Sequence, residues 1–176
     1  VYDYYTDMVI EDVINDLMET YGYSYNYAQS LVFYGGLNIY SAEIRSEQEA
    51  VEKIYADESN YPKKISGDAE DPQTGLVIMN YDGRIAVTIG GRGLKTASRI
   101  QNRSTQTTRQ PGSAIKPLSV YALSLQYNLV HYSSLVRDCY ITLPNGRRWP
   151  TNYRASLRDN GDVLLNYAIQ DSLNTV

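Results

Sequence analysis

The sequence predicts a mixed α+β fold, in which helices surround the first hairpin of an antiparallel sheet. Three observations lead to this prediction. Residues 5–20 place apolar and acidic side chains on opposite faces of a helix. Residues 76–89 hold two β-rich runs on either side of Asp82-Gly83, a tight-turn pair. Apolar residues recur at helical spacing again from Ala114 to about Val130.

Residues 1–66 read as an interdomain linker or adaptor region. Glycines after the first two predicted helices, at Gly22 and at Gly35-Gly36, supply the stop signals. The capping-box pattern from Ser46 to Glu49 opens a third helix. The expected boundaries are 5–20, 25–34 and 46–55 for the helices, 37–41 for one alternating strand and 57–72 for a polar loop.

Residues 67–176 are expected to form a second domain around the hairpin. Both strands of the hairpin are nearly continuously apolar, so we expect both of their faces to be covered. A long basic loop over 90–110 leads into the helix that begins at Ser113. The remaining expected elements are a strand over 140–143, a turn over 144–146 and a last helix from about Val163, capped by residues 159–162.

Composition excludes several classes of site. With one cysteine, Cys139, the chain has no internal disulfide and no cysteine-based zinc site. With one histidine, His131, it has no histidine cluster, and we expect His131 to cap the end of the Ser113 helix. No nucleic-acid-binding motif accompanies the basic residues, no segment is long and apolar enough to span a membrane, and nothing calls for a metal or cofactor.

Ser113 and Lys116 are the candidate chemical pair. Pro111-Gly112 breaks the preceding structure, and Pro117 is tolerated only in a first helical turn, so both side chains lie there on one face. A serine hydroxyl becomes a nucleophile when a neighbouring base takes its proton. Lysine, with an ordinary pKa near ~10.4, serves as that base only when burial or the helix dipole disfavours its charge. The Ser113 amide at the same helix start is a candidate oxyanion donor.

The pair alone is weak evidence, because Ser-x-x-Lys arises by chance in a chain of this length. The alternative is a serine that caps a helix beside a solvated lysine. The rest of the chain must therefore supply the evidence: Ser-x-x-Lys, a Ser-x-Asn-type triplet, here Ser172-Leu173-Asn174, and Lys-Thr-Gly are together the marks of penicillin-binding proteins and class A β-lactamases.

Four segments, in one order, resemble the class A (bifunctional) penicillin-binding proteins, from the linker through the N-terminal part of the transpeptidase domain. The string from Arg109 to Pro117 is the most specific of them, whereas a bare Ser-x-Asn also occurs at Ser24-Tyr25-Asn26. The matching segments are Gly35–Tyr40, Thr74–Gly91, Asn102-Arg103 with Arg109–Pro117, and Pro150–Tyr153 with Ala168 and Ser172–Asn174.

The resemblance implies a partial penicillin-binding/β-lactamase-like transpeptidase fold and a serine D,D-transpeptidase that acts on peptidoglycan stem peptides ending in D-Ala-D-Ala. Ser113 would attack the penultimate D-Ala carbonyl and would equally be acylated by β-lactams. Lys116 would take the Ser113 proton, although the acylation base is disputed in this class. Ser172 would relay a proton to the leaving amine, and Asn174 would hold substrate and Lys116. The setting implied is extracytoplasmic, in the bacterial cell envelope.

One departure from the family pattern is large: no Lys-Thr-Gly or Lys-Ser-Gly follows Asn174. That motif lies on a strand at the far wall of the family's cleft, so we expect the isolated chain to be a truncated domain with little or no activity. We also expect an open sheet edge that invites pairing with another chain. The family's membrane anchor and glycosyltransferase domain would belong to the parent protein. The alternative function is a non-catalytic penicillin-recognising or scaffold module.

Overall fold

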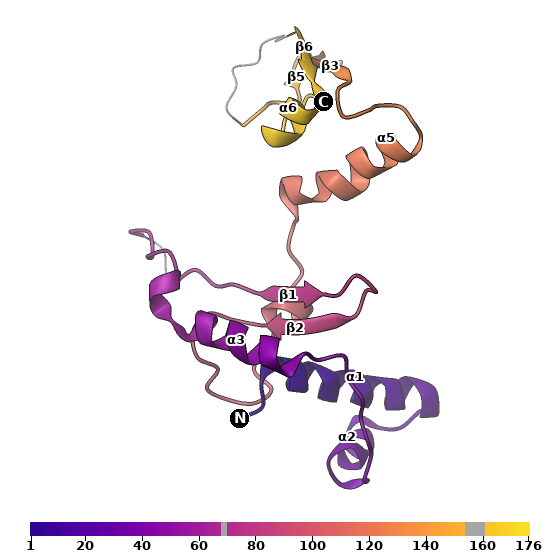
Figure 1. The fold of residues 1–176 in the computed structure, drawn as a ribbon, viewed down its shortest axis with the longest axis vertical. Helices are drawn as coiled ribbons and strands as arrows, with labels where there is room; N and C mark the ends of the chain where they lie inside the picture. Colours follow the sequence, from indigo (N-terminus) through magenta and orange to yellow (C-terminus); the bar gives the residue numbers. More distant parts are fainter. Residues whose placement is uncertain (68–69, 154–160) are drawn as a thin grey trace. The chain divides into compact units, whose positions relative to one another are not determined.

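A computed structural model describes residues 1–67, 70–153 and 161–176 of the chain. They form two compact units, Val1–Thr108 and Arg109–Val176. Helices and short antiparallel strands occur in both units (Figure 1), which confirms the predicted mixed α+β class. The adaptor boundary at residue 66 stays a prediction.

Two helices build the start of the first unit as predicted. In α1 (Tyr4–Tyr21), the Asp3 side chain accepts from the Thr6 amide, and Gly22 ends the helix with φ of +68°. In α2 (Tyr25–Tyr34), Ser24 is the cap. The apolar stripes of the two helices meet in a small core of Ile10, Ile14 and Ala28, surrounded by Leu17, Met18, Tyr23 and Val32.

The connection from α2 to the third helix differs from the prediction in two ways. Residues 37–41 join no sheet, so the predicted strand is wrong. The next helix, α3 (Arg45–Ala56), begins one residue before Ser46, and its cap residue Ile44 makes no side-chain capping bond, so the capping-box prediction is wrong too. The Ile44 amide donates instead to the carbonyl of Ala86, and this tertiary bond fixes where the helix starts. A single 3₁₀ turn, η1 (Glu58–Asn60), follows in the predicted polar loop.

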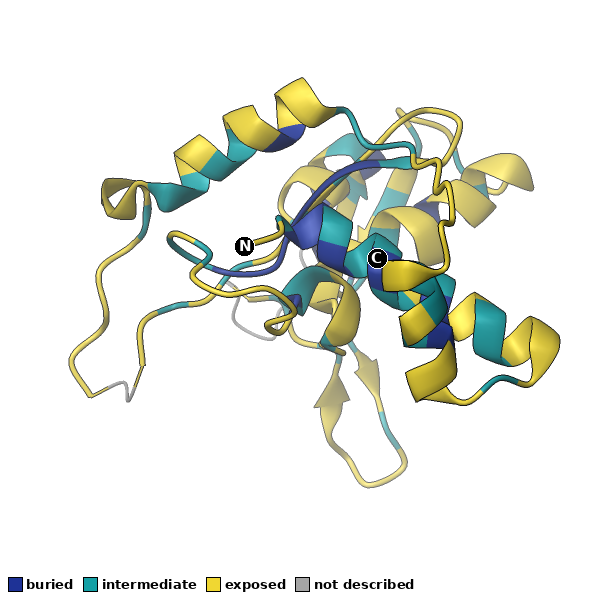
Figure 2. Ribbon diagram, turned by 90° about the horizontal axis from the view of Figure 1, so that it is seen from below, coloured by how far each residue is buried: buried dark blue, intermediate teal, exposed yellow. Residues whose placement is uncertain are grey.

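The hairpin is confirmed. Strands β1 (Leu76–Met79) and β2 (Ile85–Ile89) pair antiparallel, and Gly83 occupies the turn with φ of +88°. Residues 86–89 of β2 are buried, whereas Val77 and Met79 of β1 are exposed. Coverage on both faces therefore holds for β2 only. Exposed and intermediate residues prevail over most of both units (Figure 2).

The outer edge of β2 is occupied along its length. The carbonyl of Ala86 accepts from the Ile44 amide, and the carbonyl of Gly90 accepts from the amide of Arg103, in the short helix α4 (Arg103–Gln106). Between them the buried Gln48 side chain of α3 donates to the Thr88 carbonyl and accepts from the Thr88 amide, both at 3.1 Å. The outer edge of β2 is thus closed to pairing with another chain, and within this hairpin only β1 offers a free edge.

The second unit begins with a helical stretch in three parts. A 3₁₀ turn, η2 (Gly112–Ile115), leads through Lys116 into the π-helical η3 (Pro117–Tyr121) and then α5 (Ala122–Gln126). The helix ends about four residues before the predicted Val130, because Asn128 adopts φ of +53° and closes a C-terminal turn. His131 therefore lies beyond the helix, where its amide donates to the Ser134 hydroxyl, and its predicted capping role is wrong.

Two more strand pairs complete the second unit. The predicted strand over 140–143 is confirmed as β4 (Ile141–Thr142), which pairs with β5 (Arg148–Trp149) around Gly146. Strands β3 (Leu135–Asp138) and β6 (Gly161–Leu164) were not predicted.

The last helix, α6 (Leu165–Gln170), starts two residues later than predicted because Val163 and Leu164 belong to β6. The helix cap predicted over 159–162 is wrong for Gly161 and Asp162, which are residues of β6. The other two residues of that prediction, Asp159 and Asn160, lie outside the described residues. None of the described helices is both long and apolar enough to cross a membrane.

Candidate active site

The turn before Lys116 is built as the sequence requires. Gly112 takes φ of +56°, a conformation that glycine adopts without strain, and the chain enters the 3₁₀ turn that contains Ser113. The Lys116 amide closes this turn on the Ser113 carbonyl. Pro117 follows at the first position of the next helical segment, where its missing N–H costs nothing. Ser113 and Lys116 are therefore held in one helical turn.

The Lys116 ammonium group forms hydrogen bonds with residues 172–174, near the end of the chain. Nζ donates to the carbonyls of Ser172 and Leu173 at 2.9 and 2.8 Å, and to the Asn174 side-chain oxygen at 2.7 Å. The Ser172 hydroxyl lies 3.4 Å away. Three of the four residues singled out from the sequence, separated by up to 58 positions, thus meet at one nitrogen.

Ser172 occupies a strained position at the end of α6. Its φ is +51°, which is uncommon outside glycine. The amides of Ser172 and Leu173 return to the carbonyls of Ile169 and Ala168, the pattern of a Schellman cap. Leu173 is buried and anchors the cap. This turn is what aims the carbonyls of Ser172 and Leu173 at Lys116.

Ser113 joins the group through a shared hollow and not through a direct bond. Within the described part of the chain, the Ser113 side chain makes no hydrogen bond to Lys116 Nζ, and Ser113 is exposed. It lines a hollow of about 400 Å³, which we call the Ser113 hollow, together with Ser172 and Asn174; Tyr153, Gln170 and Asp171 complete the lining. Ser113, Ser172 and Asn174 therefore line one space.

Burial and hydrogen bonding act on Lys116 in opposite directions. Partial burial lowers the pKa of Lys116 below its ordinary value, because the charged form loses hydration. The acceptors at 2.7–2.9 Å favour the ammonium, whose three protons match three oxygens. Lys116 must lose a proton, and with it one of these three hydrogen bonds, before its nitrogen has a lone pair that can accept the proton of a neighbouring hydroxyl.

A second hollow of about 400 Å³ lies against the same lysine. We call it the Trp149 hollow; its lining is Lys116, Val120, Tyr121, Trp149, Pro150, Thr151, Asn174 and Val176. Tyr121 is 6% exposed, its hydroxyl has no partner among the described residues, and burial raises its pKa. No group of His, Cys, Asp or Glu within the described ranges is arranged to hold a metal ion.

Sequence reasoning missed three residues that support this site. Asp138, Asn152 and Thr175 form a hydrogen-bonded cluster that contacts Asn174. The only signal for them was that Asn152 belongs to the Pro150–Tyr153 segment, to which no role was attached.

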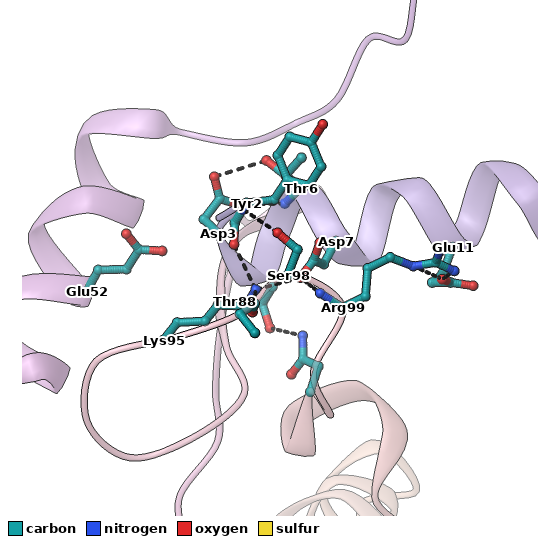
Figure 3. Close-up of polar contacts among 12 residues, drawn as sticks. Tyr2, Asp3, Thr6, Asp7, Glu11, Glu52, Thr88, Lys95, Ser98 and Arg99 are labelled. Atoms are coloured by element: carbon teal, nitrogen blue, oxygen red, sulfur yellow. Dashed lines mark hydrogen bonds and ion pairs between the residues drawn. The ribbon is translucent and has the colours of Figure 1, made fainter. Parts of the chain in front are cut away.

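The first unit has its own buried polar cluster, shown in Figure 3. Lys95 and Asp7, with side chains 8% and 7% exposed, form an ion pair of 2.6 Å. Lys95 Nζ also donates to the carbonyls of Tyr2 and Ala97, both at 2.7 Å, and the Arg99 amide donates to Asp7 at 2.5 Å. This cluster ties the loop after β2 to the start of α1, and all its groups satisfy one another except one Asp7 oxygen.

Comparison with known proteins adds a relationship to this geometry. No family model matches the chain. Among curated proteins, the chain is 31% identical over 145 residues to penicillin-binding protein 1A of Clostridium perfringens (strain 13), covering 78% of this chain and 21% of that protein. It is 30% identical over 184 residues to penicillin-binding protein 1A of Clostridium tetani, covering 99% and 23%, respectively. The chain spans about a fifth of the length of these curated relatives.

Proposed function

The chain is homologous to a segment of the class A penicillin-binding proteins, and on that premise we propose that it is part of a serine D,D-transpeptidase that cross-links peptidoglycan and is acylated by β-lactams. The observation that carries the proposal is the meeting of Lys116 with Ser172 and Asn174 beside the hollow that Ser113 lines. A solvated lysine beside a capping serine would not gather these groups.

The proposed reaction begins at Ser113. Its Oγ attacks the carbonyl carbon of the penultimate D-Ala, a C–O bond forms, and the bond to the terminal D-Ala nitrogen breaks. The Ser113 proton passes to neutral Lys116; the Ser172 hydroxyl then gives its own proton to the departing amine and takes one from Lys116, so that both groups return to their starting states. The Ser113 amide is the proposed donor to the oxyanion, and Asn174 holds substrate and Lys116. The amine of a second stem peptide then attacks the acyl carbon; the C–N bond of the cross-link forms, the C–O bond to Ser113 breaks, and a proton lost by the amine returns to the Ser113 oxygen.

A second candidate, a penicillin-recognising module without turnover, is favoured by one specific contact set. All three Lys116 protons are taken by oxygens at 2.7–2.9 Å, an arrangement suited to an ammonium and not to a base. In such a module Ser113 accepts an acyl group from a β-lactam without turnover of a stem peptide, and the hollow serves for recognition.

A labelled penicillin with intact mass measurement tests the first proposal. Ring opening adds the whole β-lactam mass, because the broken C–N bond leaves both fragments attached. We expect an adduct on Ser113, its loss in Ser113→Ala, and its retention in Ser133→Ala, which alters an exposed serine of the same unit. Release of D-Ala from a D-Ala-D-Ala peptide then separates the enzyme from the module. No adduct with the full-length parent protein would leave only the third interpretation, in which Ser113 caps a helix in an interaction domain.

The chain's setting follows from the same premise. We propose that it works within a longer, membrane-anchored protein of the cell envelope, together with a glycosyltransferase domain and a Lys-Thr/Ser-Gly strand that supplies the second oxyanion donor. Removing one such donor lowers rates by ~10²–10³, so the isolated chain should acylate slowly. Codons for Lys-Thr-Gly or Lys-Ser-Gly downstream of Val176 in the gene would support this; an immediate stop codon would contradict it.

A further inference from the structure

A cluster of three hydrogen-bonded side chains lies directly behind Asn174. Asn152 Nδ2 donates to Asp138 Oδ1 at 2.9 Å and to Thr175 Oγ1 at 3.0 Å. The Thr175 hydroxyl donates in turn to Asp138. Asp138, at the end of β3, is 3% exposed. The Asn152 amide nitrogen and the Thr175 hydroxyl both donate to the same Asp138 oxygen, Oδ1, so the direction of the hydrogen bonds in this cluster is defined.

That direction fixes which way the Asn152 amide faces. Its nitrogen side meets the Asp138 carboxylate, which only accepts, and its oxygen accepts from the Asn174 backbone amide at 2.6 Å. A flipped amide would place oxygen against carboxylate and N–H against N–H.

Asn174 is thereby held at two points. Its backbone amide is bound to Asn152, and its side-chain Nδ2 donates to the Thr151 carbonyl at 2.8 Å. With the nitrogen engaged, the side-chain oxygen points to Lys116 Nζ, 2.7 Å away. The orientation of the Asn174 side chain is therefore set by its hydrogen bonds to Asn152 and Thr151.

We propose that Asn152 is a positioning residue, which holds Asn174 in the orientation that presents its side-chain oxygen to Lys116, and that the buried Asp138 carboxylate fixes Asn152 for this task. The catalytic meaning of this assignment rests on the proposed transpeptidase function; the link from Asp138 to Lys116 through Asn152 and Asn174 does not.

The first experiment uses NMR on the full chain. In Asn152→Ala, the Asn174 amide should exchange its hydrogen at least about tenfold faster relative to the Leu165 amide, whose bond to Ser134 reports whether the unit remains folded. The Lys116 pKa should fall by about one pH unit as an acceptor of its ammonium is lost. The matched control, Asn145→Ala, alters an exposed turn of the same unit and should change neither quantity.

The second experiment exchanges donor and acceptor. Asn152→Asp alone sets two carboxylates against each other and should disturb both readouts. Combined with Asp138→Asn, it restores one amide and one carboxylate, and the new carboxylate at position 152 still accepts from the Asn174 amide. We expect the double variant to return the Asn174-to-Leu165 exchange ratio and the Lys116 pKa to near their original values.

The outcomes separate the two proposals. An unchanged Lys116 pKa and exchange ratio in Asn152→Ala, or failure of the double variant to recover either, overturns the positioning role whether or not penicillin binds. If both readouts move and recover but Ser113 forms no adduct, the positioning role stands and the transpeptidase proposal fails. Where the adduct forms, Asn152→Ala should slow acylation about tenfold with an unchanged final amount of adduct.

Discussion

Replacing Lys95 by methionine should destabilise the first unit by about 3–5 kcal/mol, because it breaks a buried ion pair from one side. The three Lys95 protons are used by Asp7 and by the carbonyls of Tyr2 and Ala97, at 2.6–2.7 Å. Methionine fills a similar volume but donates nothing. The Asp7 carboxylate would keep only the Arg99 amide as a partner in this cluster.

A second substitution tests whether this magnitude has been correctly assigned. Combining Lys95→Met with Asp7→Asn removes the stranded charge, so the double variant should be more stable than Lys95→Met alone by at least about 1 kcal/mol. Lys53→Met, which removes an exposed lysine from α3, should stay within about 0.5 kcal/mol of the original chain.

Urea unfolding followed by far-ultraviolet circular dichroism measures these values. The single tryptophan, Trp149, lies in the second unit, so its fluorescence separates that unit's transition from the first. A loss below about 1 kcal/mol in Lys95→Met, or a double variant no better than the single one, would refute the account of Lys95 and Asp7 as a mutually dependent buried pair.

Three further predictions concern single side chains. Gln48→Leu leaves the amide and carbonyl of Thr88 unpaired and should cost the first unit about 2–4 kcal/mol in the same urea assay. Ser172→Gly should stabilise the second unit by about 1 kcal/mol, since glycine adopts φ of +51° freely, yet slow β-lactam acylation; Ser172→Ala should slow acylation without the gain. Burial lowers the pKa of Lys116 in the folded chain, so between that lowered pKa and the ordinary 10.5 the unfolded chain binds more protons than the folded one. The free energy of unfolding of the second unit, followed by Trp149 fluorescence, should therefore rise with pH in that window. Lys116→Met should abolish the rise.

Elements with a strong local signal were predictable. The helices α1 and α2 combine an apolar stripe with a polar cap and a glycine stop, and the hairpin has Asp82-Gly83 at its turn. These signals act over a few residues, so the rest of the fold does not override them.

Elements decided by distant partners were not predictable. The pattern at Val163 and Leu164 favours a helix, but these residues pair with Val136 and Leu135, for which no strand was predicted. Residues 37–41 alternate like a strand, yet they join no sheet. Alternation shows that a segment can pair; the presence of a partner edge decides whether it does.

The residues proposed for the chemistry could be predicted from their spacing along the chain, whereas the cluster that supports them could not. The position of Pro117 predicts that Ser113 and Lys116 share one turn, and the Ser172–Asn174 triplet was predicted to be their partner. Asp138, Asn152 and Thr175 carry no local pattern, because aspartate, asparagine and threonine are common in turns and their bonds span 14–37 positions.

The Gln48 side chain makes with the Thr88 backbone the two hydrogen bonds that one residue of a neighbouring strand would make. Another strand can therefore be added to this hairpin only at β1. A cross-β assembly needs two exposed edges to propagate, and this sheet offers at most one. The first unit is thereby protected against open-ended fibre growth for as long as α3 stays docked. Detachment of α3 would remove the Gln48 side chain from Thr88 and leave the amide and carbonyl of this buried strand residue free to pair with another chain.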